Sequence, residues 1–113
     1  MEKYIKNIAH ESVLSLADEV QCLPGQVVSK TLAQNSYVSM TLFAFDANEE
    51  ISAHASRGDA MVTALFGTGK VTIADQEYTL HAGETIVMPA NIPHAIFALE
   101  AFKMVLTVIF PSA

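Results

Sequence analysis

Short runs of β-branched and aromatic residues follow one another from residue 26 almost to the end of the chain, and turn residues separate them. The runs span residues 27–32, 37–45, 51–53, 60–66, 70–74, 78–81, 85–88, 95–99 and 102–110. No long helical pattern interrupts them, so they predict an antiparallel all-β sandwich or barrel. Gly67-Thr68-Gly69 lies between two apolar runs and predicts a tight hairpin, because glycine adopts the positive φ that such turns need.

The first 24 residues follow a different pattern. Apolar residues at helical spacing predict one short helical turn there: Val13, Leu16, Ala17 and Val20. Pro24-Gly25 ends this segment. We therefore expect a single domain with an N-terminal segment, residues 1–24, and a β-rich barrel region, residues 26–110.

The composition narrows the classes of function. Hydrophobic residues make up 51% of the 113 residues and charged residues 16%, a balance that excludes intrinsic disorder. Twelve acidic residues against six scattered lysines and arginines give a net charge of −6, which disfavours nucleic-acid binding. The apolar runs are too short, or too interrupted by proline, to span a membrane. With one cysteine, Cys22, and no secretion signal at the start, we expect a cytoplasmic protein.

A run near the C-terminus resembles the second sequence motif of the cupin superfamily. It reads Gly-x5-Pro-x-Asn-x2-His and comprises Gly83, Pro89, Asn91 and His94. Asn91 stands where the family usually has glycine, and Ala98 where it usually has asparagine.

A second group, His54-x-Ser56-x2-Asp59 followed by Gly67, resembles the first cupin motif, which usually reads His-x-His, then Glu, then Gly. Together the two resemblances cover residues 37–110. They imply a small single-domain cupin of the RmlC-like type, an antiparallel double-stranded β-helix or jelly-roll barrel, with a degenerate first motif.

The resemblance also implies a metal site inside the barrel. Cupins usually hold iron, manganese, nickel, zinc or copper with three histidines and one glutamate. Carried over by position, the ligands here are His54, Asp59 and His94, while Ser56 replaces the second histidine with an un-ionised hydroxyl. Two imidazoles and one carboxylate are the ligand set of open iron sites. The alternative is an altered or vestigial site that holds no metal.

Strand alternation extends the expected site. Side chains two residues apart on a strand share a face. Counting from Asp59 places Met61 and Thr63 on the interior face, and counting from His94 adds Ile96. With Ser56, these residues are the predicted lining of an apolar pocket.

We therefore expect a small-molecule-binding cupin with an altered or vestigial metal site and no assigned reaction. One alternative is a metal-dependent oxygenase or isomerase that uses His54, Asp59 and His94. A weaker alternative is a sensor subunit that acts through a partner protein. Two runs, residues 37–45 and 102–110, are apolar on both faces and need cover outside the barrel. We expect a homodimer to supply that cover, with the N-terminal segment as its arm.

Overall fold

The structure, a computed structural model, describes residues 3–111. Its elements are the 3-10 turn η1 (Leu16–Glu19) and the strands β1 (Val27–Gln34), β2 (Val38–Phe45), β3 (Glu50–His54), β4 (Asp59–Phe66), β5 (Thr68–Ile73), β6 (Gln76–His81), β7 (Thr85–Met88), β8 (His94–Ala98) and β9 (Phe102–Ile109). Each strand lies within one or two residues of a run predicted from the sequence. The short helical turn is also present, although the side chain of Ser15 does not cap it.

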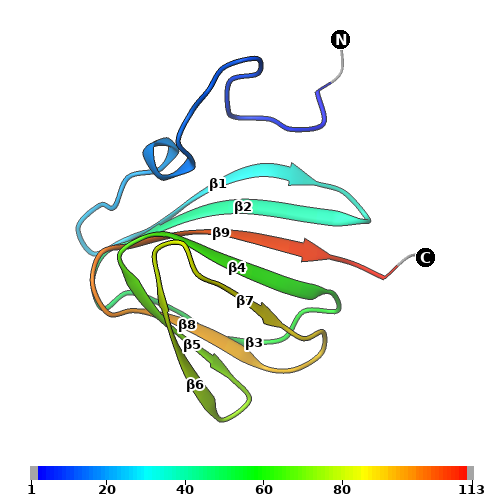
Figure 1. Cartoon of the computed structure of the whole chain (residues 1–113). Coiled ribbons are helices and arrows are strands. Elements are labelled where there is room, and N and C mark those ends of the chain that lie inside the picture. The colour runs from blue at the N-terminus through cyan, green and yellow to red at the C-terminus, as the bar shows by residue number, and fades with distance from the viewer. Residues whose placement is uncertain (1–2, 112–113) are drawn as a thin grey trace.

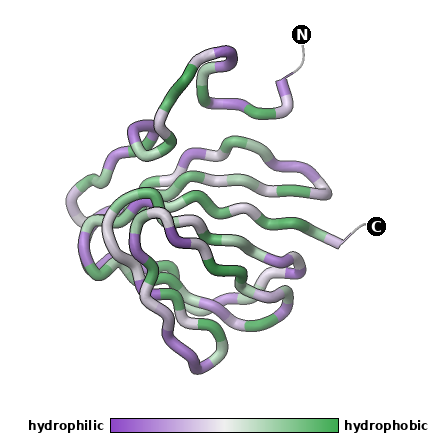
Figure 2. The backbone as a smooth tube through the Cα atoms, viewed as in Figure 1, coloured by the Kyte–Doolittle hydropathy of each residue, from purple (hydrophilic) through white to green (hydrophobic). Residues whose placement is uncertain are grey.

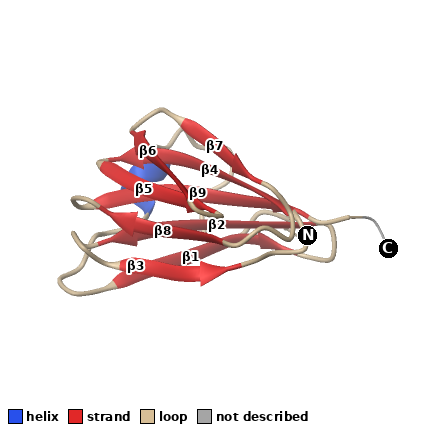
Figure 3. Ribbon diagram, turned by 90° about the horizontal axis from the view of Figure 1, so that it is seen from below, coloured by secondary structure: helices blue, strands red, loops and turns tan. Residues whose placement is uncertain are grey.

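The strands form two antiparallel sheets that face each other (Figures 1 and 3). Five strands make the first sheet, in the order β1-β2-β9-β4-β7, and four make the second, in the order β3-β8-β5-β6. Both sheets combine strands that are far apart in sequence. The antiparallel all-β architecture expected from the sequence is confirmed.

An interior cluster of apolar side chains fills the space between the two sheets. Phe45, Phe102 and Met104 are fully buried in it, and both sheets contribute members. Hydrophobic positions run along the strands, several turns are hydrophilic, and the N-terminal segment alternates between the two (Figure 2). Burial of this cluster is the main force that holds the sheets together.

A second, outer cluster lies on the opposite face of the five-stranded sheet. Leu42 and Ala44 alternate with the interior side chains of β2 and are fully buried against the N-terminal segment, with Val20 and Leu32 beside them. Lys103 Nζ donates to the Ala17 carbonyl at 2.6 Å, which helps to hold η1 in place. Part of the cover expected from a partner therefore comes from the chain's own N-terminal residues.

The turn around Gly67 is not the predicted hairpin. β4 pairs with β7 and β9, whereas β5 pairs with β6 and β8, so Gly67 carries the chain from one sheet to the other. Its φ is 75°, and a Cβ there would collide with the carbonyl oxygen of Ala101. Glycine is needed at this position for the crossing. The tight hairpin joins β5 to β6, with Ile73 opposite Gln76.

Across residues 3–111, the structure contains no helix with the length and apolar character that a membrane crossing requires.

Candidate functional site

Two of the predicted site residues lie together at one end of the sandwich. His54 ends β3 and His94 begins β8, and their Cα atoms are partners in the sheet. The imidazole rings meet edge to face, with centroids 4.5 Å apart and planes at 74°. With the connections 55–58 and 89–93, these residues form what we call the histidine end.

A bulge in β3 places His54 beside His94. Ile51 pairs with Ile96 and His54 pairs with His94, so three residues of β3 match two of β8. Ile51 packs against the interior cluster, and strict alternation would turn His54 to the opposite face. The extra residue re-aims the histidine toward its partner, which is a common use of bulges near binding sites.

His94 is buried and incompletely hydrogen-bonded. It is 3% exposed, and its Nδ1 atom has no hydrogen-bond partner among the described residues 3–111. Burial and the neighbouring His54 lower the pKa of His94 from its ordinary value, although the Ile92 backbone acts in the opposite direction. The ring is therefore neutral at pH 7. A buried polar atom without a hydrogen-bond partner lowers the stability of the folded protein by about 1–3 kcal/mol. Packing alone therefore does not explain a histidine at this position.

His54 differs from His94 in being exposed. Its Nδ1 lies 2.9 Å from the carbonyl oxygen of Ser52, and because a carbonyl can only accept, Nδ1 carries the proton and donates. In the neutral ring, Nε2 then bears the lone pair and can accept a hydrogen bond from a ligand.

Ser56 and Asp59 secure the loop that delivers His94. The carbonyl oxygen of Ser56 accepts from the backbone N–H of Asn91 at 2.6 Å, and Oδ1 of Asp59 accepts from the backbone N–H of Ala90 at 2.9 Å. The Ser56 hydroxyl oxygen also accepts from the N–H of Gly58 at 3.1 Å. Asn91 has φ 64°, a conformation that asparagine tolerates and that matches the glycine usual at this point of the cupin motif.

These residues do not fit a metal ion held by three or more protein ligands. Asp59 does not join His54 and His94, and within residues 3–111 no group of three His, Cys, Asp or Glu side chains could hold a metal. At this end of β4 the side chain that enters the interior cluster is that of Ala60, next to Asp59. Among residues 3–111, the metal-donor side chains that come together at this end are the two imidazoles.

The structure places the residues predicted to line a pocket on two different faces. Ile96 lies in the interior cluster. On β4 the interior residues are Ala60, Val62 and Ala64. Met61 is therefore on the outer face and 41% exposed, and Thr63 lies there too, with its hydroxyl 3.0 Å from that of Thr85. The difference comes from starting the alternation at Asp59, which itself faces outward.

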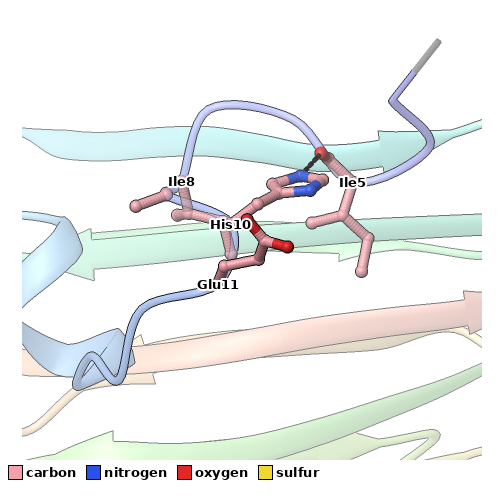
Figure 4. Close-up of a pocket in the computed structure, with 5 residues that line it drawn as sticks. Ile5, Ile8, His10 and Glu11 are labelled. Atoms are coloured by element: carbon pink, nitrogen blue, oxygen red, sulfur yellow. Dashed lines mark hydrogen bonds between the residues drawn. The ribbon is translucent and has the colours of Figure 1, made fainter. Parts of the chain in front are cut away.

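One cavity of about 260 Å³ lies away from the histidine end, within the N-terminal segment (Figure 4). Its lining is Ile5, Ile8, Ala9, His10 and Glu11. His10 Nε2 donates to the carbonyl oxygen of Ile5 at 2.6 Å, so this histidine serves a local turn. Nothing in the sequence pattern marks these residues as a cavity lining.

Residues 41–110 match the family model described as a cupin domain, and the chain therefore belongs to the cupin family. The match contains both resembling motifs and the histidine pair.

Solved structures agree with this assignment. A conserved protein of unknown function from Streptococcus pyogenes is 47% identical over 99% of this chain and 98% of its own, with a TM-score of 0.97. A cupin superfamily protein from Desulfitobacterium hafniense is 32% identical over 95% and 98% of the two chains, with a TM-score of 0.91. A cupin 2 conserved barrel domain protein from Leptotrichia buccalis is 38% identical over 85% of this chain and 47% of its own, with a TM-score of 0.82. No curated protein matches the chain.

Proposed function

We propose that this cupin binds a small molecule at the histidine end, through His54 and His94, without a metal held by a full set of protein ligands. The observation that carries the proposal is the edge-to-face contact of the two imidazoles. A bulge is needed to form that contact, and one ring is buried with an unpartnered nitrogen. Interior packing would be served better by apolar side chains.

The chemistry of the pair favours a ligand with an uncharged polar group. The lowered pKa keeps the His94 ring neutral, and the bond to Ser52 leaves Nε2 of His54 as an acceptor. A hydroxyl or amide N–H of the ligand can donate to this nitrogen. The neutral His94 ring adds no net charge, so its part in recognition rests on hydrogen-bond geometry and on contact with the ring.

A fragment screen by ligand-observed NMR tests the proposal. The probe is a mixture of small hydroxylated aromatic and aliphatic compounds, applied to the wild-type protein and to His54→Ala. Because His54 is exposed, its removal should leave the fold intact. We expect at least one compound whose binding is lost in His54→Ala and retained in the control His81→Ala, whose ring lies on an exposed turn against Glu84. Hits that bind both variants alike would overturn the proposal.

Elemental analysis of protein purified without chelator tests the competing metal-enzyme hypothesis. We expect the wild-type protein to contain clearly less than one metal ion per chain. The metal content of His94→Ala should be the same. Near-stoichiometric metal that disappears in His94→Ala would replace our proposal with the metal-dependent alternative.

We further propose that the chain pairs as a homodimer through the outer face of β4, β7 and β9. Met61, Val87 and Ile109 are exposed there, on adjoining strands, beyond the outer cluster. We expect Val87→Glu to shift sedimentation toward the monomer, whereas the control Tyr78→Glu on β6 should not. A stable wild-type monomer at micromolar concentration would refute the dimer.

A further inference from the structure

A second cavity, of about 440 Å³, lies where the N-terminal segment meets the turn between β1 and β2. Lys3, Tyr4 and Lys6 line one side, and residues 34–37 line the other. Neither His54 nor His94 contributes to it, so this cavity is separate from the histidine end. Its volume falls within the range of about 300–1,000 Å³ that is common for small-molecule sites.

Hydrogen bonds to the edge of β1 fix the N-terminal side of this cavity. The backbone N–H of Lys6 donates to the carbonyl oxygen of Leu32 at 2.8 Å, and the side-chain amide of Asn7 donates to that of Thr31 at 2.6 Å. The Lys6 side chain therefore starts from a backbone anchored to the sheet. The cavity is part of the folded chain.

Positive charge is concentrated in this lining. Two of the six lysines and arginines line the cavity, and none of the acidic residues within 3–111 does, although the chain has a net charge of −6. This arrangement favours an anionic ligand.

Two tyrosine rings and the side-chain amide of Asn35 make up another part of the cavity lining. Tyr4 is 78% exposed and Tyr37 is 64% exposed, so both rings are free to stack against a ligand. The side-chain oxygen of Asn35 accepts from the backbone N–H groups of Tyr37 and Val38, at 2.8 and 3.1 Å. Its amide NH₂ therefore remains as a hydrogen-bond donor for a ligand.

We propose that this cavity binds a small aromatic carboxylate. The lysine ammonium groups, and the NH₂ of Asn35, contact the carboxylate, while the tyrosine rings stack on the aromatic part. Lysine contributes a compact charge on a flexible stem, which suits a small anion approached from one side. The proposal is independent of the histidine end, since the two sites share no residue.

Titration with benzoate, followed by amide chemical shifts in NMR, tests this site. We expect saturable shifts at Lys6, Asn35 and Tyr37, which weaken as salt is added because exposed charges are screened. Benzamide, which keeps the ring without the charge, and inorganic phosphate, which keeps charge without a ring, should each bind several-fold more weakly. Equal binding of benzamide would refute the role of charge. Equal binding of phosphate would refute the aromatic ligand.

Variants with matched controls separate the site from non-specific attraction. Lys3→Gln and Lys6→Gln should each weaken benzoate binding by about threefold to fivefold, the scale of an exposed ion pair. Lys70→Gln, which removes one positive charge from β5, should leave it unchanged. Tyr37→Leu should weaken binding, and Tyr78→Leu on β6 should not. Equal effects in the variants and their controls, or no saturable shift with benzoate, would overturn the proposal.

Discussion

The middle of the sandwich and the histidine end differ in how their side chains are packed and hydrogen-bonded. In the middle, the Phe45 and Phe102 rings lie 5.8 Å apart, and both side chains are fully buried among apolar neighbours. At the histidine end, one imidazole is exposed and the other is buried with an unpartnered nitrogen. The first region is arranged for burial of apolar surface, and the second holds polar groups at some cost in stability.

The comparison shows that the fold tolerates a destabilising buried polar group at the end of the sandwich. Close packing in the middle stabilises the fold as a whole, so the end can carry His94 without unfolding. Hydrogen bonds from the Ala90 and Asn91 backbones then hold the loop that positions this ring. We infer that Asp59, a predicted metal ligand, and Ser56, a predicted lining residue, instead support the loop of the histidine end.

The largest expected effect comes from the middle. Phe102→Ala should lower the free energy of unfolding by about 3–5 kcal/mol, because it removes a fully buried ring and leaves a cavity. Phe66→Ala, at a residue that is 50% exposed, is the control and should cost much less. Urea unfolding followed by circular dichroism gives both values. Similar losses in the two variants would contradict the assignment of the core.

At the histidine end, Asp59→Ala should lower the free energy of unfolding by about 0.5–1.5 kcal/mol, the net contribution of one hydrogen bond. It should also shift the ring resonances of His94, because Ala90 loses its acceptor. Asp59→Asn keeps a side-chain oxygen and should restore most of the wild-type behaviour. If Ala and Asn have the same effect on the His94 resonances, Asp59 does not support the loop.

The pH dependence of stability should reveal the buried imidazole. The pKa of His94 lies below its ordinary value of 6.5 in the folded protein, so the unfolded chain binds a proton first as the pH falls. Stability should therefore decrease from about pH 7 downward and level off below the folded pKa. His94→Gln should flatten this part of the curve, measured as the urea midpoint against pH. An unchanged slope in that variant would show that another group is responsible.

The smallest effect is expected on the outer face of β4. Thr63→Ala should change the free energy of unfolding by no more than about 0.5 kcal/mol, since the side chain points away from the interior. Its neighbour Val62→Ala should cost about 2 kcal/mol, because Val62 is fully buried in the interior cluster. Thermal unfolding of the pair checks the register of β4 directly. A larger loss of stability in Thr63→Ala than in Val62→Ala would show that Thr63, and not Val62, faces the interior.

The sequence predicted much of the fold because its signals are local. Alternating apolar residues and the turn residues between them located the nine strands of the described chain within one or two residues. The motif around Gly83 and Pro89 likewise identified His94 as a residue held at the start of a strand, since proline and a positive φ restrict the loop before it.

The site was only partly predictable because its geometry depends on contacts between distant residues. The bulge that aims His54 becomes visible only when β3 is paired with β8. The outward direction of Asp59 depends on how β4 packs between β7 and β9, and the crossing at Gly67 depends on which sheet each strand joins. Local periodicity contains neither kind of information.

The sequence by itself determined the strands, the β-rich class and the choice of His54 and His94 as candidate site residues. These follow from side-chain type and spacing along the chain. Tertiary structure alone decided that His54 and His94 meet, that Asp59 supports a loop, and that the N-terminal segment packs on the outer face of the five-stranded sheet. The physical reason is that the packing of the two sheets sets the partners of each side chain. Neighbouring strands in these sheets are often far apart in the sequence.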